Sequence, residues 1–311
     1  MSITDTIKFT LKWVMTATGV MVPLFGLLLW AFQGYLIYVP SMPPGSRETT
    51  WLPSRFGMQK FDRVKLKTKD GLSLDAFWIP SQKSSKVTPT IIYCHANAGN
   101  MGHRLPISKI FHQLFPCNIL MFSYRGYGTS DGHPNEEGLK IDAQTALDWV
   151  QEKTPDEPIV LYGQSLGGAV AIDLAAKNYD SIHALIVENT FLNIPAMIPS
   201  ILPKFIQNLD FLCHQRWHND LQIRKLVVDN NKLPMPILFL SGSQDNLVDP
   251  CQMQRLYELS ITPGSDNTEM KDNLLMRRRF HSLKDGAHND TYLQSGYFDH
   301  IKGFWNDFVS P

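Results

Sequence analysis

A glycine-rich stretch around Ser165 constrains the fold of this chain more than any other feature. An apolar run at 158–162 leads into Gly163-Gln164-Ser165-Leu166-Gly167, and small and apolar residues in a helical pattern follow. A turn this tight strains the serine backbone, so the residues two before and two after the serine must lack side chains. The stretch predicts a strand, a sharp turn and a helix. By itself the pattern also fits a glycine-rich turn without chemistry, but the flanking strand and helix favour a catalytic serine.

Strand and helix patterns alternate from about residue 61 to the C-terminus. Two alternating runs, 64–67 and 72–79, flank the turn Asp70-Gly71 and predict an antiparallel hairpin. Six further apolar runs predict strands at 90–94, 119–122, 159–162, 184–187, 236–240 and 280–283. Helical stripes lie at 107–114, at 139–150 with Asn135 as the expected cap, and at 297–308. The alternation predicts an α/β fold whose eight-stranded, mostly parallel sheet has helices on both faces.

Charge and cysteine content exclude several classes of protein. The 311 residues carry 29 basic and 29 acidic side chains, so neither a nucleic acid nor a basic partner would meet a strong opposite field. The four cysteines are widely spaced and form no CxxC pair, so neither a zinc site nor a disulfide scaffold is indicated, and Cys94 and Cys117, which border predicted strands, are interpreted as buried free thiols. We therefore expect one large domain that binds no nucleic acid.

A stretch without charge, from Trp13 to Tyr38, predicts a transmembrane helix. At ~1.5 Å per residue it is more than long enough to cross a ~30 Å hydrocarbon layer. Trp13, Tyr35 and Tyr38 fall where aromatic belts occur in membrane proteins. A cleaved signal peptide is the alternative, but its apolar core would span only ~7–15 residues and end at a small-residue cleavage site. The stretch therefore favours an uncleaved signal anchor.

The flanking residues predict an orientation and a domain order. Lysines occur in the N-terminal segment 1–12, whereas no charge follows the anchor, 13–38, until Arg47. The positive-inside rule then predicts a cytosolic N-terminus and a lumenal or extracellular bulk, with the endoplasmic reticulum as the expected membrane. The proline-rich segment 39–58 predicts a stiff linker that holds the catalytic domain, 59–311, away from the bilayer.

The segment 192–233 is too apolar for a plain loop and predicts a short cap over the sheet. In open parallel sheets the ligand crevice lies beyond the carboxyl ends of the strands. An apolar cap at that position indicates an apolar or acyl substrate. The alternative is a segment that packs on the core or rests on the membrane surface.

A serine nucleophile needs a base and a carboxylate that orients the base. Among ten histidines, His288 follows the last predicted strand directly, whereas His281 lies inside that strand and His300 inside the final helix. For the carboxylate, Asp245 comes just after the penultimate strand, and Asp249 resembles the cap of the next helix. We therefore predict a catalytic triad of Ser165, Asp245 and His288, in the chain order typical of this kind of sheet.

Two backbone amides are the expected oxyanion hole. Leu166 follows the nucleophile at a helix N-terminus, where amides point at developing negative charge. The second donor should come from the loop at 95–100, after the first long parallel strand. Asn97 is our choice, with Ala96 next, and His95 is expected to shape the loop rather than to act as a second base.

Two further clusters invite a functional interpretation. His214 and His218, beside Cys213, have a spacing that suits a metal, but we interpret them as surface side chains of the cap and expect no metal site. The basic run at 277–279 is expected to be a solvated edge of an insertion at 262–276. Contact with anionic lipid is the alternative for that run.

Several motifs together resemble the α/β-hydrolase superfamily. The loop at 95–100, the motif Gly163-Gln164-Ser165-Leu166-Gly167-Gly168 and the loops around Asp245 and His288 all take part, as does the run at 124–132. Within the superfamily the chain is similar to the small membrane-anchored serine hydrolases of the α/β-hydrolase domain-containing protein 13 type. The resemblance covers about residue 60 to the C-terminus and implies the same triad and a type II topology. Ala96 replaces the glycine usual in that loop.

The sequence thus supports a membrane-anchored serine hydrolase that cleaves a carboxylic ester or thioester through an acyl-enzyme on Ser165. We expect no cofactor and no metal; the expected partners are the lipid bilayer and a small acyl substrate. The alternatives are a catalytically inactive α/β-hydrolase fold that serves as a binding module, and a peptidase of the same fold. Protein partners are not predicted.

Overall fold

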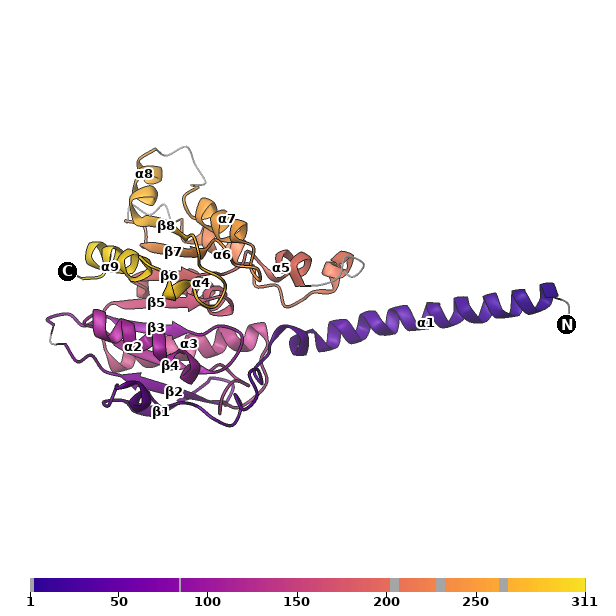
Figure 1. Ribbon diagram of the computed structural model, residues 1–311, viewed down its shortest axis with the longest axis horizontal. Helices are drawn as coiled ribbons and strands as arrows, with labels where there is room; N and C mark the ends of the chain where they lie inside the picture. Colours follow the sequence, from indigo (N-terminus) through magenta and orange to yellow (C-terminus); the bar gives the residue numbers. More distant parts are fainter. Residues whose placement is uncertain (1–2, 84, 202–206, 228–232, 263–267, 311) are drawn as a thin grey trace.

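A computed structural model describes residues 3–83, 85–201, 207–227, 233–262 and 268–310. One long helix, α1 (Ile3–Ile37), extends from an α/β domain that holds the rest of the described chain (Figure 1). The strands are β1 (Asp62–Lys67), β2 (Ser73–Ile79), β3 (Thr90–Cys94), β4 (Asn118–Phe122), β5 (Ile159–Gln164), β6 (Ala184–Glu188), β7 (Ile237–Gly242) and β8 (Arg278–Leu283). The longer helices of the domain are α2 (Leu105–Leu114), α3 (Glu136–Lys153), α4 (Leu166–Lys177), α7 (Pro250–Ser260), α8 (Thr268–Arg277) and α9 (Tyr297–Phe308).

The eight strands form one sheet in the order β1-β2-β4-β3-β5-β6-β7-β8. Strand β2 pairs antiparallel with β1 and with β4, and every pairing from β4 to β8 is parallel. The expected hairpin and the mostly parallel eight-stranded sheet are confirmed. Because β3, β5, β6, β7 and β8 run the same way, their carboxyl ends meet at one edge of the sheet. The loops that carry the predicted site residues all leave from that edge.

Helices cover both faces of the sheet (Figure 1), and an apolar core lies between the sheet and the helices on each face. One core joins the sheet to α3, α4 and α7, and the other joins the opposite face to α2 and α9. Neighbouring residues of β3 divide between the layers, with Ile92 in the first core and Tyr93 in the second. The parallel strands are therefore buried on both faces, as their continuous apolar sequences predict. Asn135 caps α3 by accepting a hydrogen bond from the Gly138 amide, also as predicted.

Helix α1 is a candidate membrane span by its length and composition. Its most apolar part has a mean hydropathy of 1.8 and no buried residue. The expected boundary at Tyr38 is wrong. The Tyr38 side chain is only 2% exposed and lies in the domain core, where its hydroxyl donates to Gln215 Oε1. The domain already covers Gln33, so the candidate span that remains in α1 runs from about Trp13 to Phe32, ~20 residues and ~30 Å, which matches the thickness of a hydrocarbon layer.

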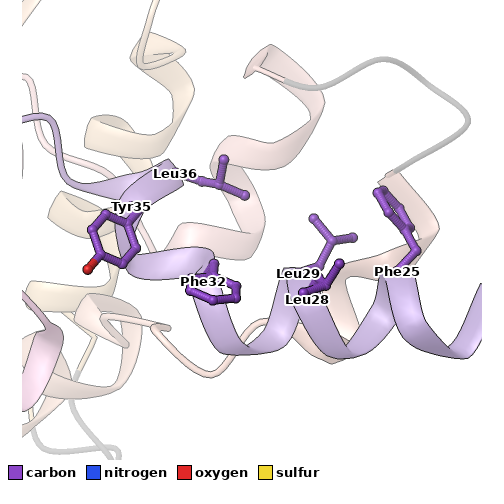
Figure 2. Close-up of a pocket in the computed structure, with 6 residues that line it drawn as sticks. All are labelled: Phe25, Leu28, Leu29, Phe32, Tyr35 and Leu36. Carbon is purple, nitrogen blue, oxygen red and sulfur yellow. The ribbon is translucent and has the colours of Figure 1, made fainter.

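An apolar groove of about 340 Å³ runs along the exposed side of α1 near the domain. Figure 2 shows its lining side chains, which are Phe25, Leu28, Leu29, Phe32, Tyr35 and Leu36. The neighbouring segment is η4 (Gln207–Leu212), which contacts α1 at Gly26 through the Leu212 side chain. This part of the domain therefore lies beside α1, the candidate membrane span.

Residues 39–58 were expected to form a spacer between membrane and domain, but they pack on the domain. The Gly99 amide donates to the Met42 carbonyl at 2.6 Å, and Asn100 Nδ2 donates to the Ser46 carbonyl at 2.8 Å. Trp51 packs against the core. Hydrogen bonds to the loop after β3 fix the segment, which the proline content alone did not predict.

Part of the segment 192–233, which was expected to form a cap, packs into the helical layer that covers the sheet. Its elements are α5 (Ile194–Ile201), η4 and α6 (Asn219–Lys225), and α6 packs against α4 and α7 as part of the helical layer. Leu202 and Phe205, which contributed to the prediction, lie outside the described residues. Ile201 and Phe211 are exposed apolar side chains on the part near α1.

The basic run at 277–279 is not a solvated edge. Arg278 is the first residue of β8 and is only 2% exposed, with its guanidinium donating to the Leu226 carbonyl at 2.9 Å. Burial lowers the pKa of Arg278 to about 9. Arg279 forms an ion pair with Asp307. The prediction failed because side chains alternate along a strand, so that a run of one residue type is divided between two faces. Helix α8, just before it, was also not predicted; residues 263–267 lie outside the described chain.

Candidate active site

Ser165 occupies a strained turn between β5 and α4. Its φ and ψ are 54° and −119°, a conformation that costs an ordinary residue free energy, and its amide donates to the Glu188 carbonyl at 2.9 Å. A Cβ added to Gly163 would lie 2.3 Å from the Gly167 carbonyl oxygen, and one added to Gly167 would lie 2.0 Å from the Cys94 carbonyl oxygen. The structure confirms why both positions lack side chains: three backbone segments meet here without room for a methyl group.

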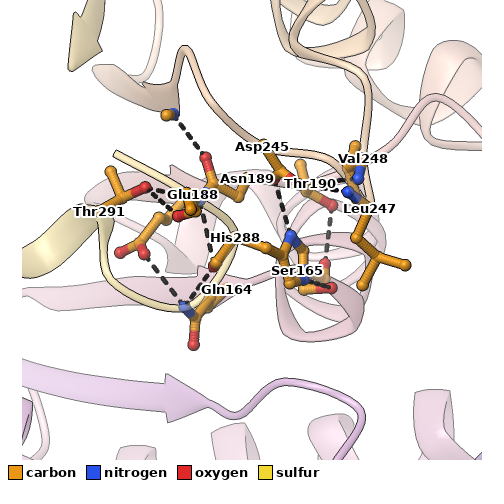
Figure 3. Close-up of polar contacts among 12 residues, drawn as sticks. Gln164, Ser165, Glu188, Asn189, Thr190, Asp245, Leu247, Val248, His288 and Thr291 are labelled. Atoms are coloured by element: carbon orange, nitrogen blue, oxygen red, sulfur yellow. Dashed lines mark hydrogen bonds and ion pairs between the residues drawn. The ribbon is translucent and has the colours of Figure 1, made fainter. Parts of the chain in front are cut away.

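Ser165, His288 and Asp245 form a continuous hydrogen-bonded chain at the carboxyl edge of the sheet (Figure 3). His288 Nε2 lies 3.0 Å from Ser165 Oγ, and His288 Nδ1 lies 2.7 Å from Asp245 Oδ2. An ionised carboxylate only accepts, so we assign the proton to Nδ1, which leaves Nε2 free to accept the serine hydroxyl. All three residues are 6–7% exposed. The structure brings together three residues that the sequence separates by up to 123 positions.

The two neighbouring aspartates have different surroundings. Asp245 Oδ1 accepts hydrogen bonds from the amides of Leu247 and Val248, both at 2.9 Å, which orients its other oxygen toward His288. Asp249 instead caps α7 by accepting from the Cys251 amide at 2.9 Å. The geometry thus separates a carboxylate that faces the imidazole from one that starts a helix.

Asn189 braces the loop that carries His288, and sequence reasoning missed it. Its Nδ2 donates to the His288 carbonyl at 3.2 Å and to Thr291 Oγ1 at 2.9 Å, and its Oδ1 accepts from the Gly242 amide at 2.8 Å (Figure 3). One side chain therefore joins the end of β6 to the ends of β7 and β8. The available signal was a polar residue just after an apolar strand, at the edge where ligands bind.

A buried carboxylate lies behind the site. Glu188 accepts hydrogen bonds from Tyr162 at 2.5 Å, from Tyr297, and from Gln164 Nε2 at 3.1 Å. Burial raises the pKa of Glu188 above its ordinary value, and the three donors oppose that effect. Gln164 Nε2 also contacts the His288 carbonyl at 3.4 Å. The network connects β5, β6 and α9 beneath the loop that carries His288, and no sequence pattern pairs these residues in advance.

The two expected oxyanion donors lie on two different elements. Leu166 opens α4 directly after Ser165. Asn97 lies in the loop after β3, which contacts Gly167 closely. His95 is buried in that loop and its ring stacks on Tyr124. Burial lowers the pKa of His95 to about 3, which suits the structural role that we expected for it. The donor roles of Leu166 and Asn97 stay predictions.

The histidines of the 192–233 segment do not gather into a metal centre within the described residues. His214 Nδ1 lies 2.6 Å from Gln33 Nε2, and its ring packs against Trp30 of α1. His218 lies beside Asp220 at 3.8 Å. His214 therefore contacts α1.

The fold and the hydrogen-bonded serine, histidine and aspartate are those of an α/β hydrolase. A family model described as the alpha/beta hydrolase fold matches residues 89–227. Among solved structures, a Pyrococcus furiosus esterase superposes with a TM-score of 0.63 at 16% identity, covering 84% of this chain and 96% of the esterase. At that identity the likeness shows the fold alone.

Relatives define the family more closely. Protein bem46 of Schizosaccharomyces pombe is 43% identical, covering 91% of this chain and 89% of the relative. Alpha/beta hydrolase domain-containing protein WAV2 of Arabidopsis thaliana is 36% identical, with 86% and 85% covered. An uncharacterized membrane protein of Saccharomyces cerevisiae is also 36% identical, with 89% of each chain covered. The chain belongs to the α/β-hydrolase family, in the group of the α/β-hydrolase domain-containing protein 13 type. This membership supports a hydrolase. Helix α1, together with the Saccharomyces cerevisiae relative named as a membrane protein, suggests that the hydrolase is membrane-anchored.

Proposed function

We propose that the protein is a membrane-anchored serine hydrolase that cleaves a carboxylic ester or thioester of an acyl, lipid-like substrate. The observation that carries the proposal is the pair of contacts at His288, 3.0 Å to Ser165 Oγ and 2.7 Å to Asp245 Oδ2. These distances lie in the range in which a base activates a serine and a carboxylate orients the base.

In the acylation step, Ser165 Oγ attacks the acyl carbon while its proton passes to His288 Nε2. The imidazolium that results is stabilised by Asp245, whose second oxygen is already held by two backbone amides. The oxyanion of the tetrahedral intermediate accepts from the Leu166 and Asn97 amides. As the intermediate collapses, His288 returns the proton to the departing alcohol or thiol, and the acyl group stays on Ser165.

Deacylation reverses these roles with water. His288 takes a proton from the water, whose oxygen attacks the acyl carbon, and the carboxylic acid leaves as Ser165 recovers its hydroxyl. Apart from the water that is consumed, side chains and amides of this chain carry out each step. The apolar segment beside α1, with exposed Ile201 and Phe211, supports a substrate that arrives from or near the bilayer.

The test is turnover of a panel of short- and long-chain acyl esters and acyl thioesters by the full-length protein in detergent micelles. We expect hydrolysis by the wild type and loss of it in Ser165→Ala. Ser243→Ala is the matched control, because Ser243 is an exposed serine near the site and, among the described side chains, its hydroxyl bonds only Ser282. A folded wild type that turns over no member of the panel would favour a binding module instead.

A further inference from the structure

The last turn of α1 has a fixed place on the domain. Gln33 Oε1 accepts from the His214 amide at 2.9 Å and from the Gln215 amide at 3.0 Å. The Tyr38 hydroxyl accepts from Trp217 Nε1 at 2.9 Å. A helix that served only as a tether would need no such contacts. The end of α1 is therefore part of the folded domain.

Asn97 joins this turn directly to the candidate active site. Its Nδ2 donates to the Ile37 carbonyl at 2.6 Å, while its Oδ1 accepts from the Val39 amide at 3.2 Å and from the Tyr127 hydroxyl at 2.6 Å. The last carbonyls of a helix lack partners within the helix. The Asn97 side chain thus supplies a hydrogen-bond donor to a carbonyl at the C-terminus of α1. The Asn97 backbone belongs to the loop after β3.

The same loop also lies against the turn that carries Ser165. A Cβ at Gly167 would meet the Cys94 carbonyl oxygen at 2.0 Å and the His95 carbonyl oxygen at 2.7 Å. On the other side, Val39 and Ala98 form a parallel bridge. The loop is held between α4 and the chain that leaves α1, so its backbone position depends on both.

We propose that Asn97 is a positioning residue through which the C-terminal turn of α1 holds the oxyanion loop in place. The tie fixes the loop so that its backbone amide faces the oxyanion that forms at Ser165. This inference rests on the proposed function, because it assumes acyl chemistry at Ser165. Hydrogen-bond donors stabilise a transition state best when they are fixed before the reaction. The helix that anchors the protein then also takes part in shaping its active site.

The test measures kcat and KM for an activated acyl ester with full-length wild type and Asn97→Ala in detergent micelles. The alanine variant keeps the backbone amide but loses all three side-chain hydrogen bonds. We expect kcat to fall about 10- to 100-fold, less than the ~10²–10³-fold typical of deleting a donor, with KM changed less than about twofold. Hydrogen exchange should become faster in both 96–100 and 37–42.

Asn118→Ala is the matched control. Asn118 accepts from the Ser81 amide and donates to Thr90 Oγ1 at the opposite edge of the sheet, so its loss tests the general cost of a missing asparagine. We expect its kcat to stay within about twofold of wild type. Equal losses of kcat in the two variants would overturn the inference, as would an Asn97→Ala enzyme with wild-type kcat.

Tyr127→Phe serves if Asn97→Ala does not fold, because it removes one hydrogen bond to Asn97 Oδ1 and leaves the asparagine in place. We expect a smaller fall in kcat, about two- to fivefold, at unchanged KM; an unchanged kcat would count against the inference. A folded wild type that hydrolyses no ester defeats the proposed function, and this inference with it. An active wild type whose Asn97 and Tyr127 variants keep full kcat defeats the inference alone.

Discussion

The two sides of the candidate active site are held in different ways. On one side, Ser165, Asp245 and His288 follow the parallel strands β5, β7 and β8, with β6 between the first two, and the sheet itself sets their spacing. On the other side, the loop with Asn97 leaves β3 but is tied to α1 and to the segment after it. The nucleophile side is therefore a product of the sheet, whereas the oxyanion side depends on a contact with a candidate membrane helix.

This difference suggests which changes each side tolerates. The elbow at Gly163 and Gly167 is closed by backbone contacts that leave no room for a methyl group. The oxyanion loop is closed by side-chain hydrogen bonds, which are individually worth about 1 kcal/mol. We expect variants of the first side to abolish turnover or folding and variants of the second side to have graded effects.

The largest expected effect is on turnover, at the carboxylate of the nucleophile side. Asp245→Asn should lower kcat ~10⁴-fold, because the amide no longer holds the Nδ1–H tautomer that leaves Nε2 free for Ser165. Asp249→Asn is the matched control, since Asp249 caps α7 and asparagine caps a helix equally well. Its kcat should match wild type. Steady-state kinetics of both variants on one ester decides between the two aspartates.

The next largest effect is on folding, at the elbow. Gly167→Ala places a methyl group 2.0 Å from the Cys94 carbonyl oxygen, which only a backbone shift relieves, so we expect a loss of more than about 4 kcal/mol in the free energy of unfolding. Gly19→Ala on α1 meets no atom within 4 Å and should fold normally. Yield and thermal melting in detergent distinguish the pair. Equal yields of folded protein would show that the elbow is looser than its geometry indicates.

A smaller effect concerns pH and His95 on the oxyanion side. Burial lowers the pKa of His95 from 6.5 to about 3, so between these values the unfolded chain binds a proton that the folded chain does not. The free energy of unfolding should therefore decrease as pH falls from 6.5, by about 1.4 kcal/mol per pH unit from this residue. In His95→Gln, the free energy of unfolding should lose this part of its dependence on pH.

The control for His95 is His183→Gln, whose ring contacts the Phe308 carbonyl at the surface. The difference between wild type and each variant, measured by melting at pH 6.5 and 4.5, isolates the contribution of one imidazole. A His95→Gln protein with the full wild-type slope would mean that this ring is not held neutral in the fold.

The smallest expected effect is at the base of α1. Tyr38→Phe removes the hydroxyl that bonds Gln215 and Trp217, and we expect a loss of about 1 kcal/mol in stability. Tyr35→Phe, three residues earlier, changes a side chain that is 72% exposed and should leave stability unchanged. Melting of both variants in the same detergent tests whether the Tyr38 hydroxyl at the end of α1 stabilises the domain. If both variants melted at the wild-type temperature, the hydrogen bonds of Tyr38 would not contribute to the stability of the domain.

The sequence predicted much of the sheet and the relative order of the site residues. Strand and helix periodicity located the eight strands, and the position of His288 just after the last strand distinguished it from His281 and His300. Such features are local, because neighbouring residues determine a run of apolar residues, a tight turn or a helix cap. The geometry that joins Ser165, Asp245 and His288 follows because parallel strands end at one edge.

The sequence did not predict the contacts between segments that are distant along the chain. The burial of Tyr38 and Arg278 depends on which elements fold against them, and neither residue type nor spacing reveals those partners. The bracing role of Asn189 depends on loops from β7 and β8. Proline content suggested a free linker at 39–58, yet hydrogen bonds to the loop after β3 hold it on the domain.

The most direct test of the account is labelling of the full-length protein by a fluorophosphonate probe, followed by identification of the modified residue by peptide mass. The account predicts one phosphonyl adduct, on Ser165, with none in Ser165→Ala. Labelling that persists in Ser165→Ala, or an adduct on another residue, would contradict the assignment of Ser165 as the nucleophile.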